Sequence, residues 1–570
     1  YEEGRFHPFK AFSRDSLLNG PSSHGKYTLE FEEFLKVYNK NSRIVSFDPR
    51  GVRQGGLESQ RFSTATRDRK EVVSYDFSYI YKISPYVILN EFGNVLNSSD
   101  IKEYGSWASQ KVAHQLPFDF GNNYEEAIMN EGLTNPDNNQ LSSQEKLTMI
   151  RSLLYERDPV KRNITFEKLS NYWEDGFAAP LIEIIRLSTD QELLQKINEI
   201  LWDKFEHENQ EDYYDWIQWL WTKNLPEEDY YFDIKSELYK HLDPLFERYF
   251  RERHDQSSIN LGEVLWGGVR QDGIPPLRNP EMIDAAKADY LDDKDIVFGA
   301  YINGVAKAYP KRILGWHEFF TDNFEENKIA GVYCTLCGTV ILYDMRYNGI
   351  VHDLGTSGFL YRSNKLMYDK STQSLWSTID GRPVIGPLIN QEITLQNYPV
   401  VTTTWKSWRQ LHPDTQVLSM DTGYSRDYSE GAAYKEYYAK DDLMFPVPHS
   451  DQRLKNKDEV LVIRTERSRE DPLAISIKYL DKKKWHQDKL NNQSFVAIAD
   501  KSSAARVYET NDIIFKEFRN GLLIDQSGSK WSLHEEYLSE PGGKILKRLP
   551  AHNIFWFAWY NAFPDTRLVH

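Results

Sequence analysis

The sequence predicts an α+β protein of several domains, in which a helical-repeat-like middle segment precedes a β-rich C-terminal domain. Three observations lead to this prediction. The chain has 570 residues, whereas a single hydrophobic core stops growing at roughly 250 to 300 residues. Apolar residues recur at helical spacing in the middle of the chain. Short β-branched and aromatic segments, separated by turn residues, dominate the last part.

Composition excludes several classes of protein. Hydrophobic residues make up 40% and aromatic residues 14% of the chain, which is typical of a globular protein. The chain has 69 basic and 85 acidic residues, a net charge of −16, so we expect no nucleic-acid partner. No run of eighteen apolar residues occurs, so we expect no transmembrane segment. Because the chain begins with Tyr1 rather than Met, we expect a periplasmic or secreted protein, one form being lipid-anchored upstream; a cytoplasmic location is the alternative.

Residues 1–140 are predicted to form an irregular N-terminal region of unknown role. Turn-rich pieces such as "NGPSSHGK" and "LTNPDNNQ" alternate with the strand-like pieces "RIVSF" and "YVIL". Residues 141–255 are predicted to form a helical, repeat-like domain. In "QELLQKINEILWDKF" one stripe holds Leu193, Leu194, Ile197, Ile200 and Leu201. Plain helical packing explains the stripe too, but this segment or the N-terminal region is our expected contact for a protein partner.

Residues 256–570 are predicted to form the β-rich domain, which follows the Pro-rich "DGIPPLRNPEM". Its strand-like segments include "DIVFGAYIN", "IAGVYC", "TVILYDM" and "EVLVIRT". Helices are expected at 281–290 and around "TTWKSWRQLH". The aromatic segment "IFWFAWYNAF" is expected to form core.

Both cysteines of the chain lie in "GVYCTLCGTVILYD", residues 331 to 344. Cys334 should end one strand, and "TVIL" should begin the next. A C-x-x-C-G turn brings both sulfurs toward one point, and Gly338 permits a left-handed backbone whose amide groups face the sulfurs. This pattern favours a metal site. A local or redox disulfide and inert buried thiols are the alternatives.

Two thiolates need further ligands to complete a metal site. Histidine is the expected source, with His317 of "GWHEFFTD" favoured and His552 second. Sulfur and imidazole ligands suit copper, which we favour for an exported protein, or zinc or iron.

A second polar block, "SGFLYRSNKLMYD", supplies the candidate substrate-binding residues Tyr361, Arg362, Asn364 and Lys365. A guanidinium can bind a carboxylate or phosphate with two hydrogen bonds, and a tyrosine can hold a proton. The alternative is a strand with one polar face.

Several long blocks in the same order resemble the bacterial domain-of-unknown-function family 3179. They are "AYPKRILGWHEFFTD", "YCTLCGT", "SGFLYRSNKLMYDKSTQSLWS", "VTTTWKSWRQLHPDTQVLS" and "LPAHNIFWFAWYNAFPDT". The resemblance covers about residues 260 to 570 and implies no activity. The preceding helical segment resembles the repeat-type extension of some members. The family's blocks map onto these residues: His317, Glu318, Asp322, Cys334, Cys337, Ser357, Gly358, Tyr361, Arg362, Asn364, Lys365, Tyr368, Asp369, Trp376 and His552.

Three functional hypotheses follow. The first is a metal-binding protein, with copper favoured, that binds the metal through Cys334, Cys337 and histidine and acts as an oxidoreductase if one coordination position is open. The second is a non-catalytic binding or assembly protein with a structural disulfide. The third is a thiol-disulfide redox protein. Whether the protein is an enzyme stays open, and no catalytic residue is assigned.

Overall fold

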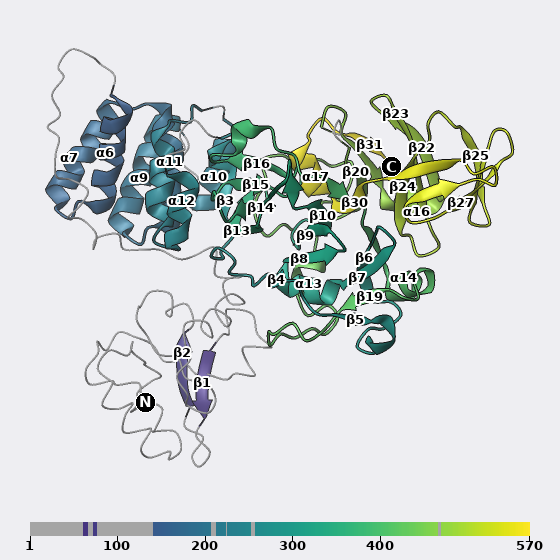
Figure 1. The fold of residues 1–570 in the computed structure, drawn as a ribbon. Coiled ribbons are helices and arrows are strands. Elements are labelled where there is room, and N and C mark those ends of the chain that lie inside the picture. The colour runs from purple at the N-terminus through teal and green to yellow at the C-terminus, as the bar shows by residue number, and fades with distance from the viewer. Residues whose placement is uncertain are drawn as a thin grey trace. The chain divides into compact units, whose positions relative to one another are not determined.

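A computed structural model describes residues 141–206, 212–223, 225–251, 257–465 and 469–570, and two strands nearer the N-terminus (Figure 1). These strands, β1 (Arg61–Ala65) and β2 (Val72–Asp76), pair antiparallel. The strand-like pieces "RIVSF" and "YVIL" lie outside the described residues. The described chain forms two compact units: one takes its residues up to 213 and 266–273, the other 214–265 and 274–570.

The middle of the chain is helical, as predicted. Its helices are α6 (Ser143–Tyr155), α7 (Pro159–Asn171), α8 (Ala178–Leu187), α9 (Gln191–Phe205), α10 (Tyr213–Trp221), α11 (Tyr230–Tyr239) and α12 (Glu247–Phe250). A capping box begins α6, in which the Ser142 side chain accepts from the Glu145 amide and the Glu145 carboxylate accepts from the Ser142 amide. The stripe predicted in α9 buries Leu193, Ile197 and Leu201. None of the helices in the described ranges has the length and apolar content needed to span a bilayer.

The C-terminal region is β-rich, as predicted. Its strands are β3 (Val264–Trp266), β4 (Leu277–Arg278), β5 (Met282–Asp284), β6 (Ile296–Ile302), β7 (Val305–Pro310), β8 (Phe319–Phe324), β9 (Asn327–Cys334), β10 (Thr339–Asp344), β11 (Arg346–Tyr347), β12 (Ile350–Val351), β13 (Leu354–Tyr361), β14 (Asn364–Asp369), β15 (Leu375–Ser377), β16 (Arg382–Ile385), β17 (Asn397–Tyr398), β18 (Val401–Thr404), β19 (Gln416–Leu418), β20 (Glu459–Ile463), β21 (Leu473–Ser476), β22 (Trp485–Leu490), β23 (Gln493–Ala499), β24 (Ala505–Glu509), β25 (Phe515–Arg519), β26 (Leu522–Asp525), β27 (Lys530–Leu533), β28 (Tyr537–Ser539), β29 (Ile545–Leu549), β30 (Ala551–Phe555) and β31 (Arg567–Val569). Its α-helices are α13 (Lys311–His317), α14 (Trp405–Leu411), α15 (Lys435–Tyr438), α16 (Ile477–Lys483) and α17 (Trp556–Ala562).

Two expectations about helices have different outcomes. The helix predicted around "TTWKSWRQLH" is α14, and it begins after Thr404, whose side chain accepts from the Ser407 amide. The helix predicted at 281–290 is wrong. That segment forms β5 and one 3-10 turn, Ala285–Lys287, because β5 pairs with β19 through Ile283 and Val417. The expected core segment "IFWFAWYNAF" does bury its aromatic residues, Trp559 among them, apart from the partly buried Tyr560.

The β-rich region contains the same architecture twice. One sheet has the strand order β18-β6-β7-β19, extended by β5, and another has the order β30-β20-β21-β31. In each, the last strand runs parallel to its neighbour, while the others are antiparallel. We name residues 293–418 the first half-domain and residues 456–569 the second half-domain.

The closing segments of the two half-domains match in sequence and in hydrogen bonding. "WKSWRQLHPDT" at 405–415 corresponds to "WFAWYNAFPDT" at 556–566. In the first, the indole of Trp408 donates to Thr415 Oγ1 at 2.9 Å. In the second, the indole of Trp559 donates to Thr566 Oγ1 at 2.9 Å. The paired tryptophans therefore occupy equivalent positions in the two sheets.

The hairpins that follow the first helix of each half-domain match as well. Glu318 caps the C-terminus of α13 and Lys484 caps that of α16, each with a left-handed backbone. The amide of Tyr333 then donates to the Glu318 carbonyl at 2.8 Å, and the amide of Ala499 donates to the Lys484 carbonyl at 2.9 Å. Strands β8-β9-β10 thus correspond to β22-β23-β24, and the cysteine turn after β9 corresponds to the turn after β23.

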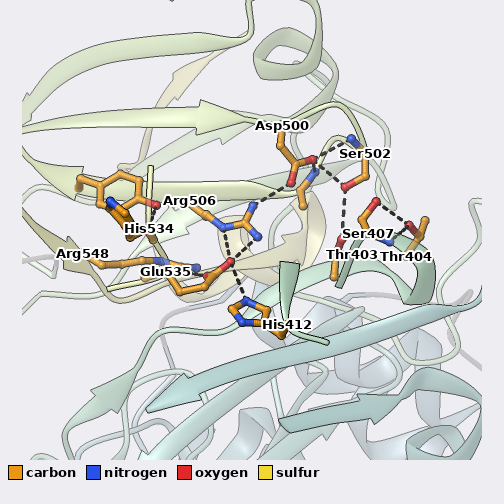
Figure 2. Close-up of polar contacts among 12 residues, drawn as sticks. Thr403, Thr404, Ser407, His412, Asp500, Ser502, Arg506, His534, Glu535 and Arg548 are labelled. Carbon is orange, nitrogen blue, oxygen red and sulfur yellow. Dashed lines mark hydrogen bonds and ion pairs between the residues drawn. The ribbon is translucent and has the colours of Figure 1, made fainter. Parts of the chain in front are cut away.

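Each half-domain places its turn against a strand of the other half-domain. The cysteine turn of the first half-domain contacts β30, where the amide of Phe555 donates to the Cys337 carbonyl at 2.8 Å. The turn of the second half-domain contacts β18, where the Thr403 and Ser502 hydroxyl oxygens lie 3.2 Å apart (Figure 2). These reciprocal contacts indicate that the two half-domains are related by an approximate two-fold axis.

Candidate functional site at the cysteine turn

The cysteine turn has the backbone that the sequence predicts. Strand β9 ends at Cys334 and β10 begins at Thr339. Gly338 has a φ of +62°, and the Cys337 amide donates to Cys334 Sγ at 3.3 Å. A Cβ at Gly338 would lie 2.6 Å from the Phe555 ring, so glycine is needed here for space as well as for conformation.

The metal site predicted at this turn is wrong. Cys334 and Cys337 are bonded to each other, so neither sulfur is a free thiolate ligand. Nor does either predicted histidine complete a ligand set with them, since His317 lies between the Pro275 carbonyl at 2.8 Å and the Tyr428 hydroxyl at 2.6 Å. Across the described residues, no group of three or more His, Cys, Asp or Glu could hold a metal ion. Copper as a cofactor stays a prediction without a supporting ligand set in this part of the chain.

The second predicted ligand, His552, lies closer to the turn but serves another contact. Its Nδ1 lies 2.8 Å from the Thr339 hydroxyl of β10. Burial lowers the pKa of His552 to about 3 and the pKa of His317 to about 4, so both imidazoles are neutral at pH 7. Both histidines are therefore neutral core residues in this structure.

A buried ion pair lies beside the turn and was missed as a feature in the sequence. Glu318 pairs with Lys365, and its other oxygen accepts from the Thr335 hydroxyl at 2.6 Å and the Tyr434 hydroxyl at 2.7 Å. Burial lowers the pKa of Lys365, and the Glu318 carboxylate opposes that shift. The carboxylate thus has three partners, which is what a buried charge requires.

Tyrosines from the segment around α15 cover the same turn. The Tyr437 hydroxyl donates to the Leu336 carbonyl at 2.8 Å, and the Tyr438 hydroxyl donates to the Thr335 carbonyl at 2.9 Å. The Tyr438 hydroxyl also lies 3.0 Å from the Tyr333 hydroxyl. Cys334 and Cys337 are only 1% and 0% exposed beneath this cover.

The predicted substrate-binding residues are brought to this region, but their polar atoms contact other protein groups. Arg362 pairs with Glu263 and donates to the Asn561 carbonyl at 2.9 Å. Asn364 Oδ1 lies 3.1 Å from Cys337 Sγ, and its amide donates to the Ala558 carbonyl at 3.2 Å. Lys365 pairs with Glu318, as described above. The half-buried Tyr361 has its ring centre 5.1 Å from the Arg362 guanidinium carbon. A role in substrate binding stays a prediction.

The alternative that treats this block as one continuous strand is wrong. Strand β13 ends at Tyr361 and β14 begins at Asn364, and the two central residues, Arg362 and Ser363, have φ values of +49° and +60°. A two-residue hairpin turn has this backbone.

The turn of the second half-domain has the same place but different chemistry. Its residues are Asp500 to Ala504, and it contains no cysteine. The Asp500 carboxylate accepts from the Ser502 amide at 2.7 Å, the Ser502 hydroxyl at 2.6 Å and the Ala504 amide at 3.1 Å (Figure 2). Ser503 has a φ of +64°, close to that of Gly338. A capping aspartate therefore closes this turn where a disulfide closes the other.

Below that turn lies a buried ionic network that joins the half-domains (Figure 2). Arg506 bonds to Asp500 at 2.9 Å and to Glu535 at 2.6 Å, and Arg548 also pairs with Glu535. His412 of the first half-domain lies 3.6 Å from Glu535. Burial alone would raise the pKa of Glu535, but the two guanidinium groups hold it well below its usual value. The charges of the network pair within the protein, which fits a structural role, although the Nε2 of His412 and the Nε of Arg548 make no hydrogen bond with the described residues.

A cavity of about 170 Å³ opens between the two turns, with residues of both half-domains in its wall. We name it the Lys311 cavity. The cavity was not predicted from the sequence. Its polar wall includes Lys311, Thr402, Glu459 and Asn553. The matching "W-x-x-W" and "PDT" letters at 405–415 and 556–566 could have revealed the repeat, and hence the strands that line the cavity.

Comparison with known proteins places most of the β-rich region in a family. A model of the family described as protein of unknown function (DUF3179) matches residues 271–566, which is more than half of the chain. No curated protein and no solved structure matches the chain.

Proposed function

The chain belongs to the DUF3179 family of proteins of unknown function, and from that premise we propose that its β-rich domain is a non-catalytic binding module in which Cys334–Cys337 is a structural disulfide. One observation supports the structural role of the disulfide most directly. The second half-domain closes the equivalent turn with the carboxylate of Asp500, which has no redox chemistry. Since a carboxylate and a disulfide hold the same loop in the same place, closure of the turn is the function they share.

The surroundings of the sulfurs also favour a structural role over thiol-disulfide exchange. Exchange requires a thiolate to reach a disulfide sulfur in line with the bond. Both sulfurs are buried, and the Tyr437 and Tyr438 hydroxyls bond to the carbonyls of the turn above them. No helix begins at Cys334 to stabilise a thiolate, because β10 follows the turn.

Two wider features of the proposal concern partners and location. The helical segment, with its repeat-like pattern, is proposed to contact a protein partner. Helix α7 supports this idea, because Val160 and Ile164, one turn apart, are 68% and 46% exposed. A periplasmic or secreted location is proposed too, since structural disulfides persist mainly in oxidising compartments.

Alkylation under four conditions tests the disulfide assignment. Iodoacetamide is applied to the native and to the urea-unfolded protein, each with and without a phosphine reductant, and both cysteines are followed by mass spectrometry. We expect labelling of both cysteines only in the unfolded, reduced sample. Rapid labelling of Cys334 in the native, reduced protein would favour the redox alternative instead.

The variant Cys334→Ala/Cys337→Ala provides the matched control. It should fold and lose about 2 kcal/mol of unfolding free energy, the entropic effect of opening so short a loop. Thiol-exchange activity that is present in the wild type and absent from the variant would contradict the proposal.

A further inference from the structure

The Lys311 cavity lies at the junction that the two half-domains share. Equivalent positions from both halves form its wall. Thr402 pairs across β18 and β6 with Phe298, and Asn553 pairs across β30 and β20 with Leu461. Both Thr402 and Asn553 line the cavity, as do Gly338 and Ser503 of the two turns. The cavity therefore lies on the approximate two-fold axis, a place where a single ligand can contact both halves.

The two halves differ at the position that supplies charge to this cavity. The first residue of α13 is Lys311, and the first residue of α16 is Ile477. Both line the cavity. Because only the first half-domain carries an ammonium group at this position, the otherwise symmetric wall has one cationic side.

Among the described residues, the ammonium group of Lys311 has no hydrogen-bond acceptor. Its Nζ lies 4.4 Å from the centre of the Tyr438 ring and makes no hydrogen bond or ion pair with the residues that the structure describes. Burial lowers the pKa of Lys311, and the carboxylates of Glu459 and Glu430 oppose that shift from a distance. These carboxylates already have other partners, since Glu459 accepts from Asn553 at 3.1 Å and Glu430 from Arg312 at 3.3 Å. A desolvated cation in this state is stabilised by an incoming anion.

The rest of the wall limits the anion's charge and shape. One ammonium balances one negative charge, and Glu459 would repel a second. Glu459 is exposed at the edge of the cavity, so solvent reaches it there. The Thr402 hydroxyl and the Asn553 carbonyl oxygen have no hydrogen-bond partner among the described residues, and with Glu459 they can accept from a donor on the ligand. A volume of about 170 Å³ holds roughly six waters, so the ligand has few heavy atoms.

We propose that the Lys311 cavity binds a small monocarboxylate whose α-carbon carries a hydroxyl or amino group. The carboxylate pairs with Lys311, and the α-substituent donates toward Thr402, Asn553 or Glu459. This site deepens the proposed binding function and rests on it. It does not use the sulfurs, so it can fail while the disulfide assignment stands.

Competitive labelling of Lys311 in the intact protein tests the site directly. Limiting acetic anhydride acetylates each lysine at a rate that mass spectrometry resolves, and the probes are L-lactate, L-alanine, acetate and inorganic phosphate at millimolar concentration. Rates are taken relative to that of the exposed Lys516 of β25, because the amine of L-alanine itself consumes anhydride. On that scale, L-lactate or L-alanine should slow acetylation of Lys311 severalfold and acetate less. Protection by phosphate equal to that by L-lactate would overturn the monocarboxylate class, and no protection by any probe would overturn the site.

A variant pair provides the second measurement. Lys311→Met keeps roughly the length of the side chain and removes its charge, whereas Lys516→Met removes the charge of an exposed lysine that does not line the cavity. The protective probe should raise the melting temperature of wild type and of Lys516→Met, and should bind Lys311→Met roughly tenfold or more weakly, the effect of losing one charged hydrogen bond. Equal binding by Lys311→Met contradicts the proposal. If Lys311→Met does not fold, the labelling result decides alone. If no probe binds and the cysteines of the native protein resist alkylation, only the ligand proposal is rejected. If the cysteines of the native protein react, the proposed function is rejected.

Discussion

Lys365 shows how a residue chosen from sequence as a ligand contact can belong to the core. Its ammonium pairs with the carboxylate of Glu318, a residue that is only 2% exposed. Lys365→Met leaves that carboxylate without a counter-charge, so we expect a loss of roughly 3 to 5 kcal/mol in unfolding free energy. Urea denaturation measures it.

The control is the double variant Glu318→Gln/Lys365→Met, which removes both charges and keeps the hydrogen bonds from Thr335 and Tyr434. It should recover part of the loss. If Lys365→Met lowers the unfolding free energy by less than about 1 kcal/mol, the Glu318–Lys365 pair contributes no more than an exposed salt bridge.

The two buried histidines make stability depend on pH. Burial holds the pKa of His552 at about 3, down from 6.5. Between these two pKa values, His552 is therefore protonated in the unfolded chain and neutral in the folded chain. This contribution to stability is complete above pH 6.5 and falls by about 1.4 kcal/mol per pH unit as the pH drops toward 3. His552→Gln should flatten the stability profile between pH 4.5 and 6 by about that slope. An unchanged slope in urea titrations would mean that His552 is protonated in the folded protein.

The turn at Arg362 and Ser363 illustrates why sequence reasoning failed for part of the site. A hairpin turn with two left-handed residues usually carries Asn-Gly, and Arg-Ser gives no such pattern. The second half-domain has Asn520 and Gly521 between β25 and β26, both with positive φ. The cysteine turn was predictable because Gly338 and the flanking β-branched residues agree. The identity of its partners was not, since Glu318, Tyr437 and Tyr438 arrive from distant segments.

At the scale of elements, Gly338 measures how tightly the cysteine turn fits against β30. Gly338→Ala adds a Cβ that would lie 2.6 Å from the Phe555 ring and also strains a residue at φ +62°. We expect a cost of about 1 to 2 kcal/mol for the backbone and roughly 1 to 3 more for the overpacking.

Gly349→Ala is the matched control. Gly349 has a φ of +80°, and nothing lies within 4 Å of an added Cβ. It should show only the backbone cost. Equal denaturation midpoints for the two variants would mean that β30 moves aside freely, which contradicts the close packing of Gly338 against Phe555.

The helix expected at 281–290 failed for an element-scale reason. The sequence of this segment is compatible with a helix or a strand. Pairing of β5 with β19 selects the strand, and these strands lie more than a hundred residues apart in the chain. By contrast, α14 and α9 were predictable because each carries its own apolar stripe and N-terminal cap. Local patterns therefore predicted helices well, while strand pairing with distant partners decided the rest.

At the scale of the whole β-rich region, the repeated architecture was the main feature that sequence reasoning missed. Only the short segments ending in "PDT" share many letters. Elsewhere the halves share hydrogen-bond positions and backbone conformations, such as the left-handed ends at Glu318 and Lys484. Because different side chains can support the same backbone conformation, the two halves have similar structures but few identical residues. The broad fold class was therefore predictable from the sequence, whereas the repeat was not.

The reciprocal contacts predict that the two half-domains open as one cooperative unit. The cysteine turn rests on β30, and the Asp500 turn rests on β18, so neither turn keeps its support when the other half unfolds. Loosening the first turn with Cys334→Ala/Cys337→Ala should therefore lower protection against hydrogen exchange equally in β9 and in β23. Native-state exchange with peptide-level mass spectrometry measures both strands in the intact chain. If β9 lost protection while β23 kept it, the halves would be separate cooperative units, and the Lys311 cavity, whose wall comes from both halves, would open whenever either half unfolded.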